Sequence, residues 1–213
     1  PLTFWTTNGM ALGMAAQSIF LSMALTDRLR QLEAEKRRLE LTQSHYLELS
    51  LTDALTGLHN KRFLTTELDL AVLGAHHTRS SLALMLLDLD DFKRINDTMG
   101  HSAGDSVLAT LARSMRSCTR ESDSLCRFGG DEFVIVLPGV TEMTAFNVAE
   151  RIRNRFHLDW LESSGEKEEK CRVSVSIGVV SLRDNEMAQV LLTRADSAMY
   201  EAKRLGKNRS VLK

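Results

Sequence analysis

The stretch "RESDSLCRFGGDEFVIVLPG" (residues 120–139) places two glycines and two acidic residues between two short apolar segments. The apolar segments are typical of β-strands, and Gly129 and Gly130 supply the tight turn that joins such strands in a hairpin. A turn of this kind needs no charge, yet Asp131 and Glu132 stand side by side directly after the glycines. The sequence therefore predicts a hairpin whose acidic tip serves a function beyond folding.

Helices and strands alternate around this hairpin from Leu51 onward. The segment "SLALMLLDLD" (81–90) is almost continuously apolar and ends in acids, as expected of a strand buried on both faces. Another strand is predicted over 171–182, an edge strand over 209–213, and helices over 101–118, 141–161 and 187–206. Helices interleaved with a sheet whose middle strands form a hairpin predict an α/β (α+β) fold of the ferredoxin-like type.

The composition is that of a globular protein. Hydrophobic residues make up 43% of the 213 residues and charged residues 26%, which allows one domain with a well-formed core plus an extension. Lysine plus arginine number 27 and aspartate plus glutamate 28, and this balance does not indicate a nucleic-acid partner. Cys118, Cys126 and Cys171 are odd in number and lack CxxC spacing, so we expect reduced thiols in a cytosolic domain.

The first 26 residues contain no charged side chain. Spanning a bilayer takes roughly 20 apolar residues, and a group of arginines and lysines follows Asp27, as expected on the cytoplasmic side. Residues 1–26 are therefore predicted to hold the end of a transmembrane helix, with a buried helix of a soluble domain as the alternative. Because the chain begins at Pro1 and not at a methionine, we expect a longer protein with a sensor region before it.

Residues 27–50 are strong helix formers of mixed charge and predict a long signalling helix. The 4-3 spacing found along coiled coils connects Leu25, Leu29, Leu32, Lys36, Leu39, Gln43 and Tyr46. We expect a coiled-coil linker here. The alternative is a single solvated helix, because this seam is short and two of its members, Lys36 and Gln43, are polar.

Two acids end predicted strands that would lie side by side. Asp88 closes the buried strand and Asp131 lies at the hairpin tip, so both carboxylates should converge on one edge of the sheet. Such a pair suits Mg²⁺, which is bound by one or two carboxylates together with substrate phosphates. The segment "DLDDFKRIND" (88–97) then turns from strand to short helix, whose first amides and Lys93 could meet phosphate. Taken singly, the glycine turn and the strand-end acid also have ordinary structural explanations.

Five segments taken together make the pattern specific, and with them the chain resembles the GGDEF family of diguanylate cyclases from about Leu51 to Lys213. They are "LTDALTGLHNKR" (51–62), "DLDDFKRINDTMGHSAGD" (88–105), "RESDSLCRFGGDEF" (120–133), "SIGV" (176–179) and "YEAKRLGKNR" (200–209). The resemblance implies a palm-type nucleotidyl cyclase domain with a central mixed sheet. It also implies an enzyme that condenses two GTP into cyclic di-GMP and two pyrophosphates.

The resemblance assigns roles around the hairpin. Asp88, Asp131 and the carbonyl of Leu89 would bind Mg²⁺ (or Mn²⁺), and Glu132 would support that site. Asp131 would also help to deprotonate the attacking 3′-hydroxyl. Lys93 would stabilise charge on the phosphate in the transition state, the electrostatic task common to phosphoryl transfer.

The resemblance also assigns the GTP-binding residues. Asn96 and Asp105 would recognise guanine, with His101 in the same pocket. Lys203 and Lys207 would reach the triphosphate from the last helix, although the family often has arginine at the second position. The structural alternative for these two lysines is a solvated helix end.

Arg120 and Asp123 form an RxxD upstream of the hairpin, as in family members with product feedback. A guanidinium suits both phosphate and the Hoogsteen edge of guanine, and Arg151 matches a position that often assists this inhibitory site. We therefore expect allosteric binding of cyclic di-GMP here. The alternative is a surface ion pair.

One domain holds one GTP while the product contains two nucleotides, so the resemblance implies a homodimer. It further implies a membrane-bound sensor-type protein, attached to the inner membrane through its N-terminal segment, with the catalytic domain in the cytoplasm. Three alternatives remain: a catalytically inactive GGDEF-like receptor of cyclic di-GMP, a cyclase with another nucleotide choice, and a structural dimerisation module. Asp105 argues against the second, and the third leaves the five segments unexplained.

Overall fold

The computed structural model describes residues 14, 17, 20–38, 51–164 and 173–213. The chain divides into two units, residues 1–49 and residues 50–213. In the first unit, residues 20–38 form a continuous helix, as predicted for the signalling segment up to residue 38. No helix within the described residues is both long enough and apolar enough to span a bilayer.

The helix of residues 20–38 leaves its apolar side chains uncovered within its own unit. Leu25, Leu29 and Leu32 are 61%, 54% and 50% exposed. These are the first three positions of the predicted coiled-coil seam. The later seam positions Leu39, Gln43 and Tyr46 lie outside the described residues, as does most of the predicted transmembrane segment.

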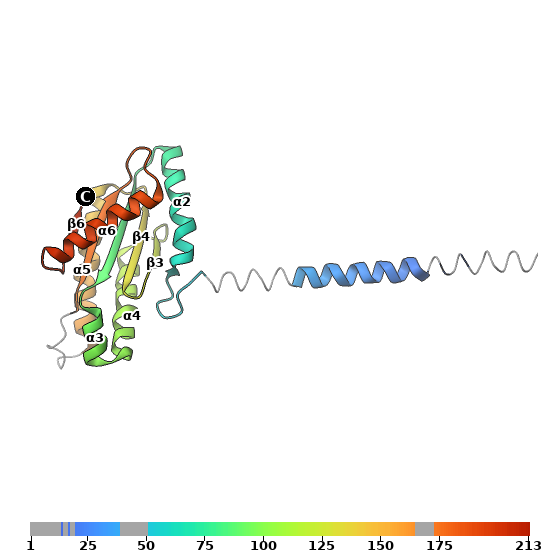
Figure 1. The fold of residues 1–213 in the computed structure, drawn as a ribbon, viewed down its shortest axis with the longest axis horizontal. Coiled ribbons are helices and arrows are strands. Elements are labelled where there is room, and N and C mark those ends of the chain that lie inside the picture. Colours follow the sequence, from blue (N-terminus) through green and yellow to red (C-terminus); the bar gives the residue numbers. More distant parts are fainter. Residues whose placement is uncertain (1–13, 15–16, 18–19, 39–50, 165–172) are drawn as a thin grey trace, which may run out of the picture. The chain divides into compact units, whose positions relative to one another are not determined.

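The second unit is built on a six-stranded mixed sheet with helices on both faces (Figure 1). Its strands lie in the order β1-β3-β4-β2-β5-β6, with the β3–β4, β4–β2 and β2–β5 pairs antiparallel and the two outer pairs parallel. In chain order the elements are β1 (His59–Asn60), α2 (Lys61–Thr78), β2 (Leu82–Leu89), α3 (Phe92–Met99), α4 (His101–Cys118), β3 (Ser124–Arg127), β4 (Glu132–Pro138), α5 (Glu142–Ser164), β5 (Val175–Ser181), α6 (Ala188–Arg204) and β6 (Ser210–Leu212). The mixed α/β fold predicted from the sequence is confirmed.

The strand β2 shows why helices cover both faces of the sheet. All eight of its residues are buried, and successive side chains of a strand point to opposite faces. Leu84 and Leu86 lie in a core with residues of α2 and α6, whereas Met85 and Leu87 lie in a second core with residues of α4 and α5. The continuous apolar run therefore encodes a central strand between two helical layers, as expected of a strand buried on both faces.

The predicted hairpin is confirmed. Strand β3 pairs antiparallel with β4, with Arg127 opposite Phe133. The turn between them contains both glycines and Asp131. Strand β4 also pairs with β2, so the hairpin tip lies beside the end of β2, and β6 lies at the outer edge, as predicted for the C-terminal segment.

Candidate active site

The acidic residues at the ends of β2 and β4 lie together. Asp88 is opposite Glu132 in the β2–β4 pairing, and it is only 6% exposed. The next residue, Leu89, donates its backbone N–H to the carbonyl oxygen of Asp131 at 3.2 Å. The pairing of β2 with β4 thus fixes the hairpin tip against the strand end, and the expected convergence of Asp88 and Asp131 is present.

Burial makes the charge on Asp88 unfavourable. Desolvation raises the pKa of Asp88 to about 6, the nearby Lys203 ammonium opposes this rise, and the charges of Asp131 and Glu132 add to it. Lys203 reaches Asp88 from α6, with its Nζ 2.5 Å from Asp88 Oδ1. The family resemblance implies that Lys203 reaches the triphosphate, and in the structure its ammonium pairs with the Asp88 carboxylate.

The donor atoms of this edge fit a hard divalent cation. The buried Asp88 carboxylate lies among acidic neighbours and already holds one positive charge, that of Lys203. Carboxylate and carbonyl oxygens are the ligands that Mg²⁺ and Mn²⁺ prefer. In the part of the chain that the structure describes, no three His, Cys, Asp or Glu side chains are placed to hold a single ion.

Helix α3 begins directly after this edge. Asp91, which precedes it, has a φ of +54°, and its Oδ1 lies 2.6 Å from Lys207 Nζ. The hydrogen bond from Lys207 holds the pKa of Asp91 below its usual value, and the same bond raises the pKa of Lys207. Lys93 is exposed in the first turn of α3, on the same segment. Lys93, Lys203 and Lys207 therefore all lie near the end of β2.

The predicted guanine-binding residues come from the packed pair α3 and α4. Asn96 of α3 lies against Gly104 of α4, so close that a Cβ added at Gly104 would be 2.0 Å from Asn96 Oδ1. Asp105 follows Gly104 directly, and His101 lies one turn earlier on the same helix; both side chains are exposed. The structure thus brings Asn96 close to the segment that carries His101 and Asp105. The sequence did not indicate that Gly104 permits this close approach, because its neighbour Asn96 is eight positions away in another helix.

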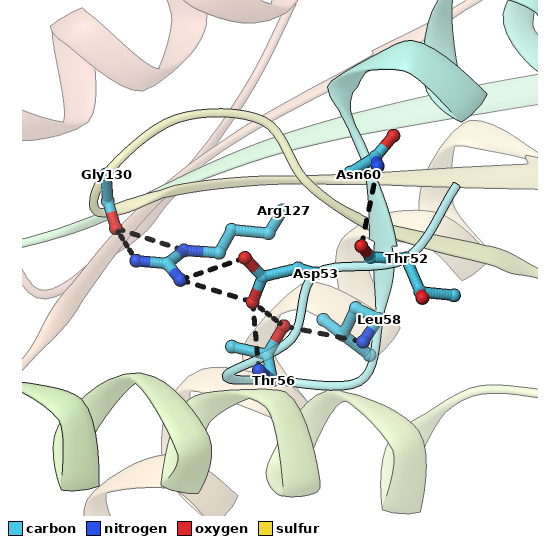
Figure 2. A network of polar contacts seen from close by, with 7 residues as sticks. All are labelled: Thr52, Asp53, Thr56, Leu58, Asn60, Arg127 and Gly130. Atoms are coloured by element: carbon cyan, nitrogen blue, oxygen red, sulfur yellow. Dashed lines mark hydrogen bonds and ion pairs between the residues drawn. The ribbon is translucent and has the colours of Figure 1, made fainter. Parts of the chain in front are cut away.

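A polar network braces the hairpin from the start of the domain (Figure 2). Arg127 donates from Nη1 to both carboxylate oxygens of Asp53, at 3.2 and 3.1 Å. It donates from Nε and Nη2 to the carbonyl of Gly130, at 3.2 and 2.7 Å. Burial would raise the pKa of Asp53, but hydrogen bonds from Thr56 and Arg127 hold it below its usual value. Sequence reasoning missed this brace, although both ends lie in motif segments.

The residues of the predicted inhibitory site lie at the other end of β3. The Asp123 carboxylate accepts the backbone N–H of Arg120 at 2.8 Å, and Asp123 N–H donates to the Arg120 carbonyl at 3.1 Å. The Arg120 side chain is exposed. Arg151 of α5 donates from Nη2 to the carbonyl of Cys118 at 2.5 Å, which places it beside the segment leading to Arg120. Asp123 thus shapes a turn, and in this structure it bonds the Arg120 backbone.

Fold and site together define a palm-type nucleotidyl cyclase domain. The family model described as "Diguanylate cyclase, GGDEF domain" matches residues 50–209. The chain therefore belongs to the GGDEF family of diguanylate cyclases.

Known relatives support this membership. The chain is 41% identical over 166 residues to the response regulator PleD of Caulobacter vibrioides, and the aligned region covers 77% of this chain and 36% of PleD. It is 38% identical over 176 residues to diguanylate cyclase A of Treponema denticola, and this alignment covers 81% of this chain and 47% of that protein. The chain thus spans less than half the length of either relative.

A solved structure shows the same fold. It contains the coiled coil and GGDEF domain of DgcB from Caulobacter crescentus in complex with c-di-GMP. The similarity has a TM-score of 0.76 at 30% sequence identity and covers 88% of this chain and 98% of that one.

Proposed function

We propose that this chain is a diguanylate cyclase that condenses two GTP molecules into cyclic di-GMP and two pyrophosphates. The observation that carries the proposal is the meeting of Asp88 with Asp131 and Glu132 at the β2–β4 edge, within a domain of the GGDEF family. A catalytically inactive receptor of cyclic di-GMP is less well supported, because both acids are intact and adjacent.

The reaction joins two nucleotides held by two copies of the domain. The 3′-oxygen of each GTP forms a bond to the α-phosphorus of the other, the bond from that phosphorus to the bridging oxygen of pyrophosphate breaks, and the 3′-hydroxyl proton is lost. Asp131 accepts this proton or orients the hydroxyl that loses it. Lys93, in the first turn of α3, stabilises the charge that develops on the phosphate oxygens.

The divalent cation belongs at the acidic edge. Asp88, Asp131 and the Leu89 carbonyl would hold it, with Glu132 in support, and the bound cation would supply positive charge to the phosphates. Lys203 pairs with Asp88 Oδ1 in the structure, and with a cation held by that carboxylate the Lys203 ammonium would be available to the triphosphate. Lys207 contributes a second positive charge beside it.

The nucleotide choice comes from α3 and α4. The Asp105 carboxylate accepts hydrogen bonds from N1–H and the 2-amino group of guanine, a donor pair that adenine lacks. Asn96 and His101 complete the pocket. Packing of Asn96 against Gly104 sets the spacing of the two helices and hence the width of this pocket.

Regulation and assembly extend the proposal. Arg120, Asp123 and Arg151 bind the product cyclic di-GMP and lower activity from a distance. The helix that starts before residue 27 pairs two copies through a coiled coil. The N-terminal segment attaches the protein to the inner membrane, with the cyclase domain in the cytoplasm.

A turnover assay tests the activity itself. The purified chain is incubated with Mg²⁺ and either GTP or ATP, and the products are separated by chromatography. We expect one cyclic di-GMP and two pyrophosphates for every two GTP consumed, and no cyclic dinucleotide from ATP. Asp105→Ala should reduce the preference for GTP. Binding of cyclic di-GMP without any turnover of GTP would favour the receptor.

A further inference from the structure

A second acid of the "DLD" segment is buried more deeply than the first. Asp90 is 3% exposed, and its carboxylate accepts three hydrogen bonds. Two come from side-chain hydroxyls of the β5 region, Ser174 Oγ at 2.6 Å and Ser176 Oγ at 2.7 Å. The third comes from the backbone N–H of Asn208 at 3.0 Å, 118 positions along the chain. This carboxylate therefore joins the end of β2 to the loop that follows α6.

The loop that Asp90 holds has an unfavourable backbone. Gly206, Lys207 and Asn208 have φ values of +112°, +61° and +47°. Two successive non-glycine residues in the left-handed region are unfavourable, and such conformations persist only where surrounding contacts fix them. The buried bond from Asn208 N–H to Asp90 is a contact of this kind, and Asp90 is thus the internal support of the loop.

The supported loop carries Lys207 and directly follows α6, the helix that carries Lys203. Lys203 is in the last turn of α6, with its ammonium at Asp88, and Lys207 lies within the loop, with its ammonium at Asp91. Asp91 itself has a φ of +54°. Two loops with left-handed residues thus face each other, joined at a buried point by Asp90 and at an exposed point by the Asp91–Lys207 pair.

We propose that Asp90 is a positioning residue for the triphosphate of GTP. It does not touch the nucleotide, but it ties the loop after α6 to the end of β2 and so keeps Lys207 in that loop, and Lys203 in the last turn of α6, beside the acidic edge. The inference rests on the proposed function only in taking GTP as the ligand. The base is recognised by residues of α3 and α4, and none of the three hydrogen bonds of the Asp90 carboxylate reaches either helix. Asp90 therefore affects binding of the β- and γ-phosphates and leaves binding of the nucleoside part unchanged.

The test compares two ligands that cannot react, because both lack the attacking hydroxyl: 3′-deoxy-GTP and 3′-deoxy-GMP, titrated with Mg²⁺ by calorimetry. Asp90→Ala removes all three hydrogen bonds, and Asp90→Asn keeps the volume but can no longer accept with both terminal atoms. Asp69→Ala, at an exposed acid of α2, is the control. Each Asp90 variant is also made together with Lys203→Met and Lys207→Met, which forms a double-mutant cycle.

We expect Asp90→Ala to weaken triphosphate binding about tenfold and monophosphate binding less than about twofold. The loss of triphosphate affinity in Asp90→Asn should lie between those of the parent and Asp90→Ala. In the background that lacks both lysines, neither Asp90 variant should weaken triphosphate binding by more than about a further twofold. Equal weakening of both ligands, or an unchanged effect without the lysines, would show that Asp90 serves folding alone. If Asp90→Ala does not fold, Asp90→Asn decides by the same comparison, and an equal or absent effect on the two ligands overturns the inference. Because no turnover is measured, a chain that binds in this way but makes no cyclic di-GMP would refute only the proposed function.

Discussion

At Asp88 the needs of folding and of the proposed chemistry oppose each other. A carboxylate that is 6% exposed and has Asp131 and Glu132 as neighbours is unfavourable when ionised. Folding alone would favour a neutral residue there. A cation site needs the charge, and the Lys203 ammonium offsets part of its cost in the structure.

Asp88→Asn should therefore abolish cyclase activity while stabilising the fold at neutral pH. The pKa of Asp88 is raised from 3.8 to about 6 in the folded state. The contribution of this group to stability is thus full below about pH 4 and is lost as the pH rises through 6, by roughly 3 kcal/mol at most. Asp88→Asn lacks this loss, so its greater stability relative to the parent should develop as the pH rises from about 4 through 6. Denaturant unfolding at pH 4 and pH 7, in the presence of a chelator, measures it.

The control for this comparison is Asp69→Asn, which changes an exposed acid on α2. It should alter neither the activity nor the pH dependence of stability. If Asp88→Asn were less stable than the parent at pH 7, the Asp88 carboxylate would be a net stabilising partner of Lys203, and the assignment of an unfavourable charge would be wrong.

Arg120→Ala tests the inhibitory site. The Arg120 side chain is exposed at the end of β3 away from the hairpin, so its loss should leave the initial rate within about twofold of the parent. Product inhibition should disappear, because the guanidinium is the expected partner of phosphate and guanine. Progress curves with and without added cyclic di-GMP check both points. Unchanged inhibition would show that Arg120 and Asp123 only form a structural turn and do not bind cyclic di-GMP.

The sequence identifies residues that act in short segments better than residues that act through distant contacts. Asp88 and Asp131 could be predicted to converge, because each ends a strand with a clear apolar pattern. Asp90 and Arg127 could not be assigned a partner. Their bonds reach Asn208 and Asp53, 118 and 74 positions away, and no local pattern indicates that such segments meet.

Among the elements, the contact between α3 and α4 sets the geometry of the proposed nucleotide pocket. Helix α3 has eight residues and only Ile95 is fully buried, so its position depends on the packing against α4. Gly104 permits this close approach, because any larger residue would overlap Asn96. The hydrophobic pattern of 101–118 predicted α4, but it did not show that one glycine governs the distance to its neighbour.

Gly104→Ala should raise the KM for GTP about tenfold or more, because the added methyl group displaces Asn96. The matched control is Gly74→Ala in α2, where nothing lies within 4 Å of the added Cβ. In a helix interior this control should gain up to about 1 kcal/mol of stability from helix propensity, with unchanged kinetics. Steady-state kinetics and thermal unfolding of both variants give the comparison. Equal kinetic constants for the two would mean that Asn96 does not contact the nucleotide.

At the scale of the whole molecule, the proposed reaction requires two copies of the domain. Its rate would then depend on how often two domains meet, and a helix that pairs two copies would supply the necessary proximity. The helix of residues 20–38 exposes Leu25, Leu29 and Leu32 at the spacing of a coiled-coil seam. An exposed apolar row of this kind is stabilised by a second copy of the same helix.

Removal of residues 1–50 should make specific activity depend strongly on protein concentration. At low micromolar concentration the truncated domain should lose most of its activity, and raising the concentration should restore it, whereas the intact chain should vary much less. Sedimentation velocity beside a turnover assay over the same dilution series provides the measurement. Constant specific activity of the truncated domain would mean that the helix does not supply the pairing.

The most direct test of the proposed chemistry compares the intact chain with Asp131→Asn in one assay of GTP conversion at saturating Mg²⁺. The change keeps the size of the side chain at the hairpin tip and removes one of the three carboxylates that meet at the end of β2. We predict cyclic di-GMP and pyrophosphate from the parent and a loss of at least about a thousandfold in rate from the variant, with the same circular dichroism spectrum and Tm within a few degrees. A parent that forms no cyclic di-GMP, or a variant that forms it at the parental rate, would contradict the assignment of this edge as the catalytic centre.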